Sequence, residues 1–95
     1  MSEDLNAAAA MLNEKLDGGF DGVAKFVITG EGAIMVDQSG ARVGDEEAEV
    51  TLTADAETFK DMMSGELNPT SAFMTGKLSV DGDMGKAMAL GSALG

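Results

Sequence analysis

The 95-residue sequence predicts an α+β fold in which helices cover a five-stranded, mainly antiparallel sheet. Three observations support this fold class. Short runs that contain Val, Ile and Thr alternate between apolar and polar residues, which is typical of strands. Other runs place apolar residues at helical spacing, and Asp, Asn-Pro and Gly mark the boundaries between runs. Since no linker or repeat interrupts this order, we expect residues 1–95 to form a single domain.

The chain is expected to open with a helix. The helix begins at Ser2, whose side chain can cap it, and it is stopped by Gly18-Gly19. Its apolar stripe consists of Leu5, Ala8, Ala9, Leu12 and Leu16. Such a stripe predicts that one side of this helix packs against the sheet.

Four strands are expected next. The first, second and fourth of these strands are expected at residues 23–29, 33–38 and 48–53. The third is a short strand that directly follows a tight turn through Ser39-Gly40. Gly30 and Gly32 allow the chain to turn between the first two strands. Phe26 and Ile28 share one face of the first strand. In the last strand Val50 and Leu52, with Ala48 before them, face inward, and polar residues alternate with them, as in an antiparallel strand with one solvated face.

The second half is expected to contain two helices, a strand and a final helix. Asp55 and Asn68-Pro69 begin the two helices, which Gly65 and Gly76 end. The fifth strand is expected at residues 77–81. Asp83 caps the final helix. The apolar residues of these four elements are Phe59, Met62, Met63, Phe73, Met74, Leu78, Val80, Met84, Ala87, Met88, Leu90 and Leu94.

Composition excludes several classes of function. The formal charge of −11, with five scattered lysines and a lone Arg42, argues against nucleic-acid binding and allows at most transient contact with anionic membranes. Solubility explains this charge best, and life in a salty environment is the weaker explanation. The sequence has no histidine or cysteine, so it lacks the residues of common proton-transfer and thiolate sites.

Three motifs suggest a ligand-binding site, but none of them is a convincing match. "GEGAIM" (30–35) has Met35 where a dinucleotide fingerprint needs its last glycine. Asp81 and Asp83 have calcium-loop spacing, yet Gly85 and Ser92 stand where further ligands belong. The acidic run at 45–49 is better explained as a solvated loop. We therefore expect no catalytic residue, metal or cofactor.

The eight methionines leave two interpretations open. Methionine fills irregular cores, and it also lines promiscuous apolar pockets because it repacks around different ligands. Five of the eight lie in the predicted helical cover, at positions 62, 63, 74, 84 and 88. Position and composition alone do not decide whether these methionines belong to the core or line a pocket.

Residues 50–90 resemble the sterol carrier protein-2 family of non-specific lipid-transfer domains. The resemblance is carried by the Thr-rich strand, "SGELNP", "AFMTGKL" and "VDGDMGKAM" in this order, and more loosely by the N-terminal half. It implies a sheet and helices that enclose an apolar tunnel for sterols, fatty acids, fatty acyl-CoA or phospholipids, without catalytic residues. The lining residues expected from this resemblance and from the inward sheet face are Phe26, Ile28, Leu52, Phe59, Met62, Met63, Phe73, Met74, Leu78, Met84 and Met88.

The resemblance also suggests a ligand class and a context. Glu66 stands where relatives often carry Lys, which disfavours acyl-CoA and favours an uncharged or carboxylate-headed lipid. The chain shows neither a peroxisomal ending nor a secretory start, so a free-standing bacterial-type protein in the cytoplasm is expected. Gly85 and Gly91 predict a final helix that moves during lipid exchange, or one that only packs tightly.

Two functions follow from the sequence. The first is a lipid-binding and lipid-carrying domain. The second is a non-catalytic accessory domain that binds a protein partner, such as an enzyme of lipid metabolism. An enzyme acting on an acyl or sterol substrate is disfavoured because histidine and cysteine are absent.

Overall fold

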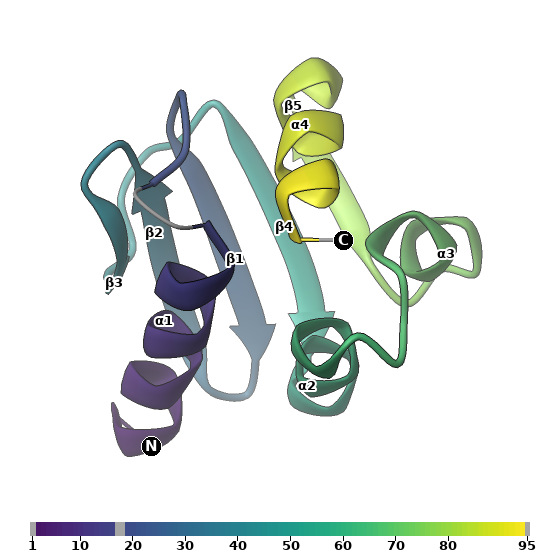
Figure 1. Cartoon of the computed structure of the whole chain (residues 1–95), viewed down its shortest axis with the longest axis horizontal. Coiled ribbons are helices and arrows are strands. Elements are labelled where there is room, and N and C mark those ends of the chain that lie inside the picture. Colours follow the sequence, from purple (N-terminus) through teal and green to yellow (C-terminus); the bar gives the residue numbers. More distant parts are fainter. Residues whose placement is uncertain (1, 17–18, 95) are drawn as a thin grey trace.

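The computed structural model of the chain describes residues 2–16 and 19–94 (Figure 1). Its elements follow the predicted order: α1 (Ser2–Leu16), β1 (Ala24–Thr29), β2 (Gly32–Asp37), β3 (Gly40–Val43), β4 (Val50–Asp55), α2 (Ala56–Ser64), α3 (Pro69–Met74), β5 (Ser79–Gly82) and α4 (Met84–Leu94). The predicted stop at Gly18 lies outside the described residues, as does the predicted capping by Ser2, whose backbone is described but whose side chain is not.

The five strands form one sheet in the order β3-β2-β1-β4-β5. Three of the four strand pairs are antiparallel, so the prediction of a five-stranded, mainly antiparallel sheet is confirmed. The central pair is parallel, with Ala24 of β1 opposite Val50 of β4. This pair brings the two most regularly alternating strands together, and it sets Phe26 beside Leu52 on the same face.

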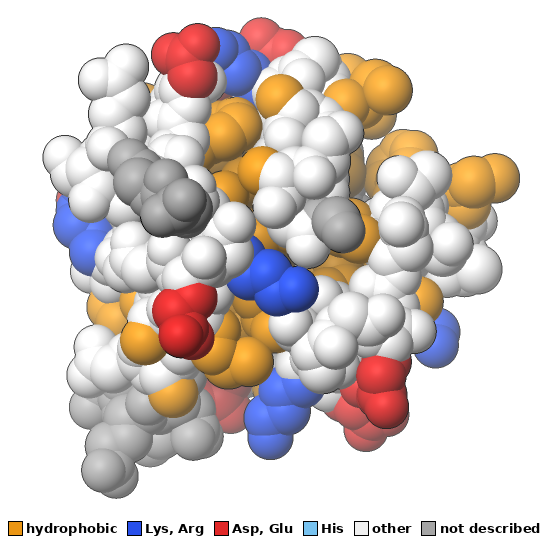
Figure 2. All heavy atoms as spheres, viewed as in Figure 1, with side chains coloured by type: hydrophobic (Ala, Val, Ile, Leu, Met, Phe, Trp, Pro, Cys, Tyr) orange, Lys and Arg blue, Asp and Glu red, His pale blue; other side chains and the backbone are white. Residues whose placement is uncertain are grey.

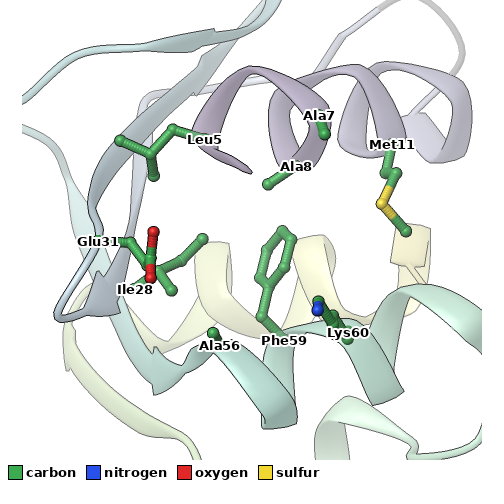
Figure 3. Close-up of a pocket in the computed structure, with 9 residues that line it drawn as sticks. All are labelled: Leu5, Ala7, Ala8, Met11, Ile28, Glu31, Ala56, Phe59 and Lys60. Carbon is green, nitrogen blue, oxygen red and sulfur yellow. The ribbon is translucent and has the colours of Figure 1, made fainter. Parts of the chain in front are cut away.

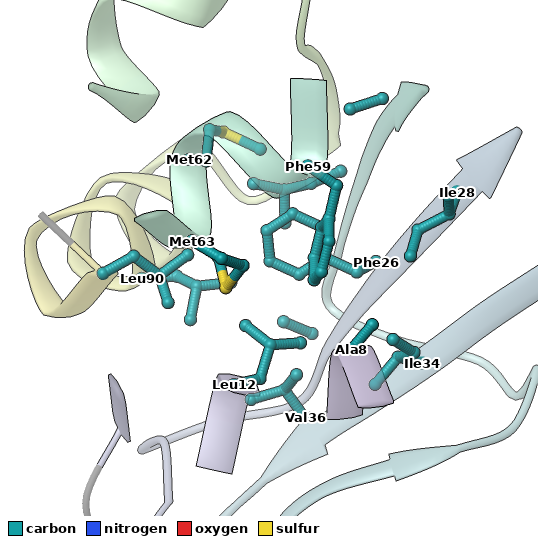
Figure 4. Close-up of a cluster of buried hydrophobic side chains, with 14 of the residues drawn as sticks. Ala8, Leu12, Phe26, Ile28, Ile34, Val36, Phe59, Met62, Met63 and Leu90 are labelled. Carbon is teal, nitrogen blue, oxygen red and sulfur yellow. The ribbon is translucent and has the colours of Figure 1, made fainter. Parts of the chain in front are cut away.

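One face of the sheet carries the hydrophobic core. The helices α1 and α4 lie in front of the sheet in Figure 1, and α2 lies near the ends of β1 and β4. Side chains from α1, α2, α4 and the sheet meet in one cluster, part of which is shown in Figure 4. The largest fully buried members of this cluster are Phe26, Leu12, Ile34, Met62, Leu90, Val36 and Val50. This cluster fixes the helical cover on which the site depends.

The other face of the sheet is partly covered near β2. Both faces of β2 are buried, because Ala33 and Met35 are buried as well as Ile34 and Val36. The segment after β3 folds across them: the Gly44 amide donates to the Ala33 carbonyl at 3.1 Å, and the Glu46 amide donates to the Met35 sulfur at 3.3 Å. Met35 therefore serves as core on the far side of the sheet.

Three predicted strand boundaries are wrong by two residues: the start and the end of the fourth strand, which ends at Asp55, and the start of the fifth. The fourth strand begins at Val50, and Ala48 lies half-buried before it. The fifth strand begins at Ser79, because the backbone amides of Lys77 and Leu78 both donate to the Ala72 carbonyl at 2.8 and 3.0 Å. Those bonds hold the end of α3, so the two residues are not free to join the sheet.

Short polar side chains begin three of the helices, as predicted. Asp55 accepts a hydrogen bond from the Thr58 amide at 2.7 Å, Asn68 from the Thr70 amide at 2.8 Å, and Asp83 from the Lys86 amide at 3.1 Å. Gly65 ends α2 with φ 86°, a conformation that glycine adopts without strain. Among the helices of the described residues, none has the length and apolar character needed to cross a bilayer.

Candidate functional site

An open cavity lies between α3, α4 and the sheet, and we call it the groove. Its volume is about 350 Å³. The floor comes from β1, β4, β5 and the residue preceding β5, through Phe26, Leu52, Leu78 and Val80. The walls come from α3 and α4, through Pro69, Thr70, Phe73, Met74, Met84, Ala87, Met88, Gly91, Ser92 and Leu94. Figure 2 shows hydrophobic side chains gathered along α3 and α4, on the right of the view.

Large apolar side chains stand exposed at the rim of the groove. Met74 is 79% exposed, Met88 71%, Met84 46% and Phe73 44%, although a hydrophobic side chain of this size is normally buried. All four line the groove. Contiguous exposed apolar surface of this kind marks a binding site more often than a defect of packing.

The groove walls are almost entirely apolar. No acidic or basic side chain lines the groove among the residues that the structure describes, and its polar side chains are the hydroxyls of Thr70 and Ser92. On α4 the lining residues Met84, Ala87, Met88 and Gly91 recur at helical spacing. Ala87 and Gly91 are the small members of this stripe, so they take up little of the space beside the methionines. The groove is therefore suited to an apolar ligand without charge along most of its length.

A second, smaller cavity lies between α1 and α2, and we call it the recess. Its volume is about 200 Å³. Figure 3 shows α1 side chains on one side, α2 side chains on the other, and Ile28 with Glu31 at one end. The lining residues are Leu5, Ala7, Ala8, Met11, Ile28, Glu31, Ala56, Phe59 and Lys60. Both cavities lie over the same face of β1, because Phe26 and Ile28 are two residues apart on this strand.

The structure places most of the predicted lining residues in the two cavities. Seven line the groove: Phe26, Leu52, Phe73, Met74, Leu78, Met84 and Met88. Ile28 and Phe59 line the recess. Met62 is a core residue with 1% of its surface exposed and lines neither cavity, while Met63 borders a shallow depression beside Met11. Since no described residue lines both cavities, a continuous tunnel stays a prediction.

Several groove residues were not predicted from the sequence. They are Pro69, Thr70, Val80, Ala87, Gly91, Ser92 and Leu94. The helical stripe on α4 contained a signal for Ala87 and Gly91, because they repeat at the spacing of Met84 and Met88. Glu66, expected to influence the choice of head group, lies in the exposed turn after α2 and lines neither cavity.

The acidic groups with perturbed pKa values lie outside the groove. A hydrogen bond from Arg42 at 2.6 Å, supported by the Ser39 amide, holds the pKa of Asp37 below its usual range. The amide of Thr58 does the same for the pKa of Asp55, with smaller help from the Thr58 side chain and Lys77. These carboxylates hold a turn and a helix end. Among the described residues, no three acidic side chains are grouped as a metal would require.

Comparisons with known proteins agree with this architecture. The SCP-2 sterol transfer family matches residues 2–95. Hydroxysteroid dehydrogenase-like protein 2 of Xenopus tropicalis is 33% identical over 103 residues, covering 100% of this chain and 25% of the relative. The chain thus spans about a quarter of that relative's length.

Two solved structures from Aedes aegypti share the fold. The crystal structure of sterol carrier protein 2 like 2 aligns with a TM-score of 0.77 and 19% identity, covering 96% of each chain. The solution structure of sterol carrier protein-2 in complex with palmitate aligns with a TM-score of 0.75 and 23% identity, covering 92% of this chain and 90% of the other. At these identities the two structures support the fold rather than a ligand.

Proposed function

The chain belongs to the SCP-2 sterol transfer family, and from this premise we propose that it binds and carries a lipid whose apolar part lies in the groove. The observation that carries this proposal is the exposed apolar rim formed by Met74, Met84, Met88 and Phe73. A ligand that covers these side chains removes apolar surface of both partners from water, and this removal is the driving force for binding.

The expected affinity follows from the length of the buried chain. Burying about 12 methylenes at roughly 0.8 kcal/mol each contributes on the order of 10 kcal/mol. Ordering the ligand and the rim side chains costs several kcal/mol, so a dissociation constant of roughly micromolar order is expected. Affinity should rise with chain length until the accessible space is full.

The ligand class follows from charge. Palmitate is bound in the solution structure of the Aedes aegypti relative, and a fatty acid or a sterol-like molecule suits the uncharged groove of this chain. A coenzyme A head group carries several negative charges, and the net charge of −11 opposes its approach. No catalytic step is proposed, because the groove contains no acid, base or strong nucleophile among its described lining residues.

A second candidate function rests on the length of the relatives. The dehydrogenase-like relative is about four times as long as the aligned region, so domains similar to this chain occur together with other segments. An accessory domain that presents a lipid to an enzyme of lipid metabolism would use the same groove. It would differ from a free carrier in having a stable protein partner.

Native mass spectrometry of freshly purified protein, followed by fatty-acid titration of the delipidated protein, tests the proposal. Thr70→Trp should fill the groove from α3 and abolish binding, because Thr70 lines the groove. Ser71→Trp is the matched control: Ser71 is the next residue of the same helix, exposed, and lines neither cavity. Failure of the unmodified protein to bind any long-chain lipid, or equal binding by both tryptophan variants, would contradict the proposal.

A further inference from the structure

Two phenylalanine rings form the boundary between the groove and the recess. Phe26 of β1 lines the groove, and Phe59 of α2 lines the recess. Their ring centroids are 5.4 Å apart with an interplanar angle of 78°, an edge-to-face contact (Figure 4). The two rings therefore touch each other while each faces a different cavity.

Both rings are held firmly in place. Phe26 is completely buried and Phe59 is 3% exposed. Phe26 lies in the middle of the sheet beside Leu52 and opposite Ile34, so its position is set by two neighbouring strands. Phe59 instead comes from a single helix, and Figure 3 shows its ring standing between α2 and α1. Phe59 is thus the part of the boundary that can be removed without altering the sheet.

Both cavities are open to solvent, but their borders differ in polarity. The groove opens at an exposed apolar rim, whereas the recess is bordered by Glu31 and Lys60, whose charged groups do not favour entry of an acyl chain from that side. An acyl chain that enters through the groove meets Phe26 at the floor, with Phe59 behind it. The space beyond that pair amounts to about 200 Å³, compared with about 350 Å³ in the groove.

We infer that Phe59 determines the longest acyl chain that this protein accepts, by closing the groove against the recess. The inference rests on the proposed lipid-binding function and adds a specificity-determining residue to it. Removing the Phe59 ring joins the two cavities along β1, from Phe26 to Ile28. Acyl chains that are too long for the groove alone then extend over Ile28 and remain shielded from water.

The test compares saturated fatty acids of increasing length, from about 10 to about 22 carbons, by calorimetry below their micelle concentrations. Each methylene that enters the protein lowers the dissociation constant about fourfold, and each methylene left in water lowers it no further. The unmodified protein should show a rise in affinity that reaches a plateau. In Phe59→Ala the plateau should move to longer chains, with a gain of roughly 15-fold for every two methylenes added beyond the original limit.

Three variants separate this effect from general loosening of the core. Phe59→Leu retains an apolar side chain and should move the plateau by a smaller amount. Leu12→Ala removes a fully buried side chain that lines neither cavity, so it should leave the plateau unchanged. Ala7 is exposed and lines the recess, so adding Ala7→Leu to Phe59→Ala should fill the new space and return the plateau toward its original length.

The possible results distinguish the inference from the proposed function. A plateau that is the same in the unmodified protein and in Phe59→Ala overturns the inference and leaves lipid binding intact. Affinity that keeps rising through the longest acids in the unmodified protein also overturns it, because no boundary is then limiting. Absence of binding by every fatty acid in the unmodified protein overturns the proposed function, and the inference with it.

Discussion

Truncation of single methionines separates the pocket-lining role from the core role. Met88 is 71% exposed and stands at the groove rim, so Met88→Ala removes few contacts within the folded protein. The unfolding free energy of the Met88→Ala variant should differ from that of the unmodified protein by less than about 0.5 kcal/mol, as for most surface substitutions. Met62 is 1% exposed, so Met62→Ala should cost about 2–5 kcal/mol through lost burial and a new cavity.

The effect of Met88→Ala on lipid affinity can be estimated from the same exposure. Complete burial of a methionine side chain contributes about 1.5–3 kcal/mol, and a ligand on one side covers roughly half of the exposed part of Met88. Loss of this cover amounts to roughly 0.5–1 kcal/mol, which weakens binding about two- to fivefold. The combined Met74→Ala and Met88→Ala variant should multiply the losses if the two sites act independently.

Urea unfolding of delipidated protein and calorimetric titration with palmitate measure the two quantities separately. The expected result is a stable Met88→Ala variant with weaker palmitate binding, and a destabilised Met62→Ala variant. Loss of several kcal/mol of stability in Met88→Ala would show that the methionine belongs to the core. Unchanged affinity in the combined variant would show that the rim does not contact the lipid.

Three further predictions concern α4, charge and pH. An added Cβ at Gly91 lies 3.7 Å from Pro69, which is an ordinary contact, so Gly91→Ala should stabilise the fold by up to ~1 kcal/mol. If α4 opens during lipid exchange, the same substitution should slow lipid transfer between vesicles. A destabilised variant with an unchanged transfer rate would contradict this prediction. Palmitate should outcompete palmitoyl-CoA most strongly at low salt, and added salt should reduce the difference between their affinities. A difference that does not depend on salt would refute the argument that the negative charge of the protein disfavours coenzyme A. The lowered pKa of Asp55 means that its contribution to stability, present above the unfolded value of roughly 4, is lost as pH falls through the folded value. Asp55→Asn, which still caps α2, should therefore lose less stability than the unmodified protein in urea unfolding between about pH 5 and pH 2, and identical pH profiles would count against this role.

Local features of the fold were predictable because their causes lie within a few residues. Asp55, Asn68 and Asp83 each accept a hydrogen bond from an amide two or three residues later. The alternation in β1 and β4 likewise reports a buried and a solvated face directly. The family resemblance added the expectation that Phe73, Met74, Met84 and Met88 border a cavity, and the structure brings all four to the groove.

Features that depend on distant parts of the chain were not predictable in the same way. The parallel pairing of β1 with β4 joins residues separated by β2 and β3, and alternation alone does not choose between neighbours. Met62 and Met74 have the same side chain on neighbouring helices, yet one is core and the other is exposed. The difference comes from the placement of α3, whose end is held by two amides that bond to the Ala72 carbonyl.

Small residues were missed for a different reason. Ala87 and Gly91 line the groove on the same stripe of α4 as Met84 and Met88, but their small size gives the sequence no conspicuous signal. An added Cβ at Gly85 would meet the Asp83 carboxylate at 3.2 Å, within the same helix start.

The central claim, that a lipid occupies the groove, is tested most directly by NMR of the protein labelled at its methionine methyl groups. On addition of palmitate, the methyl signals of Met74, Met84 and Met88 should shift, because all three line the groove. The Met35 signal should stay constant, because this residue is buried on the opposite face of the sheet beneath the segment after β3. Shifts confined to Met11 would place the lipid in the recess instead, and the absence of any shift at saturating palmitate would contradict the account.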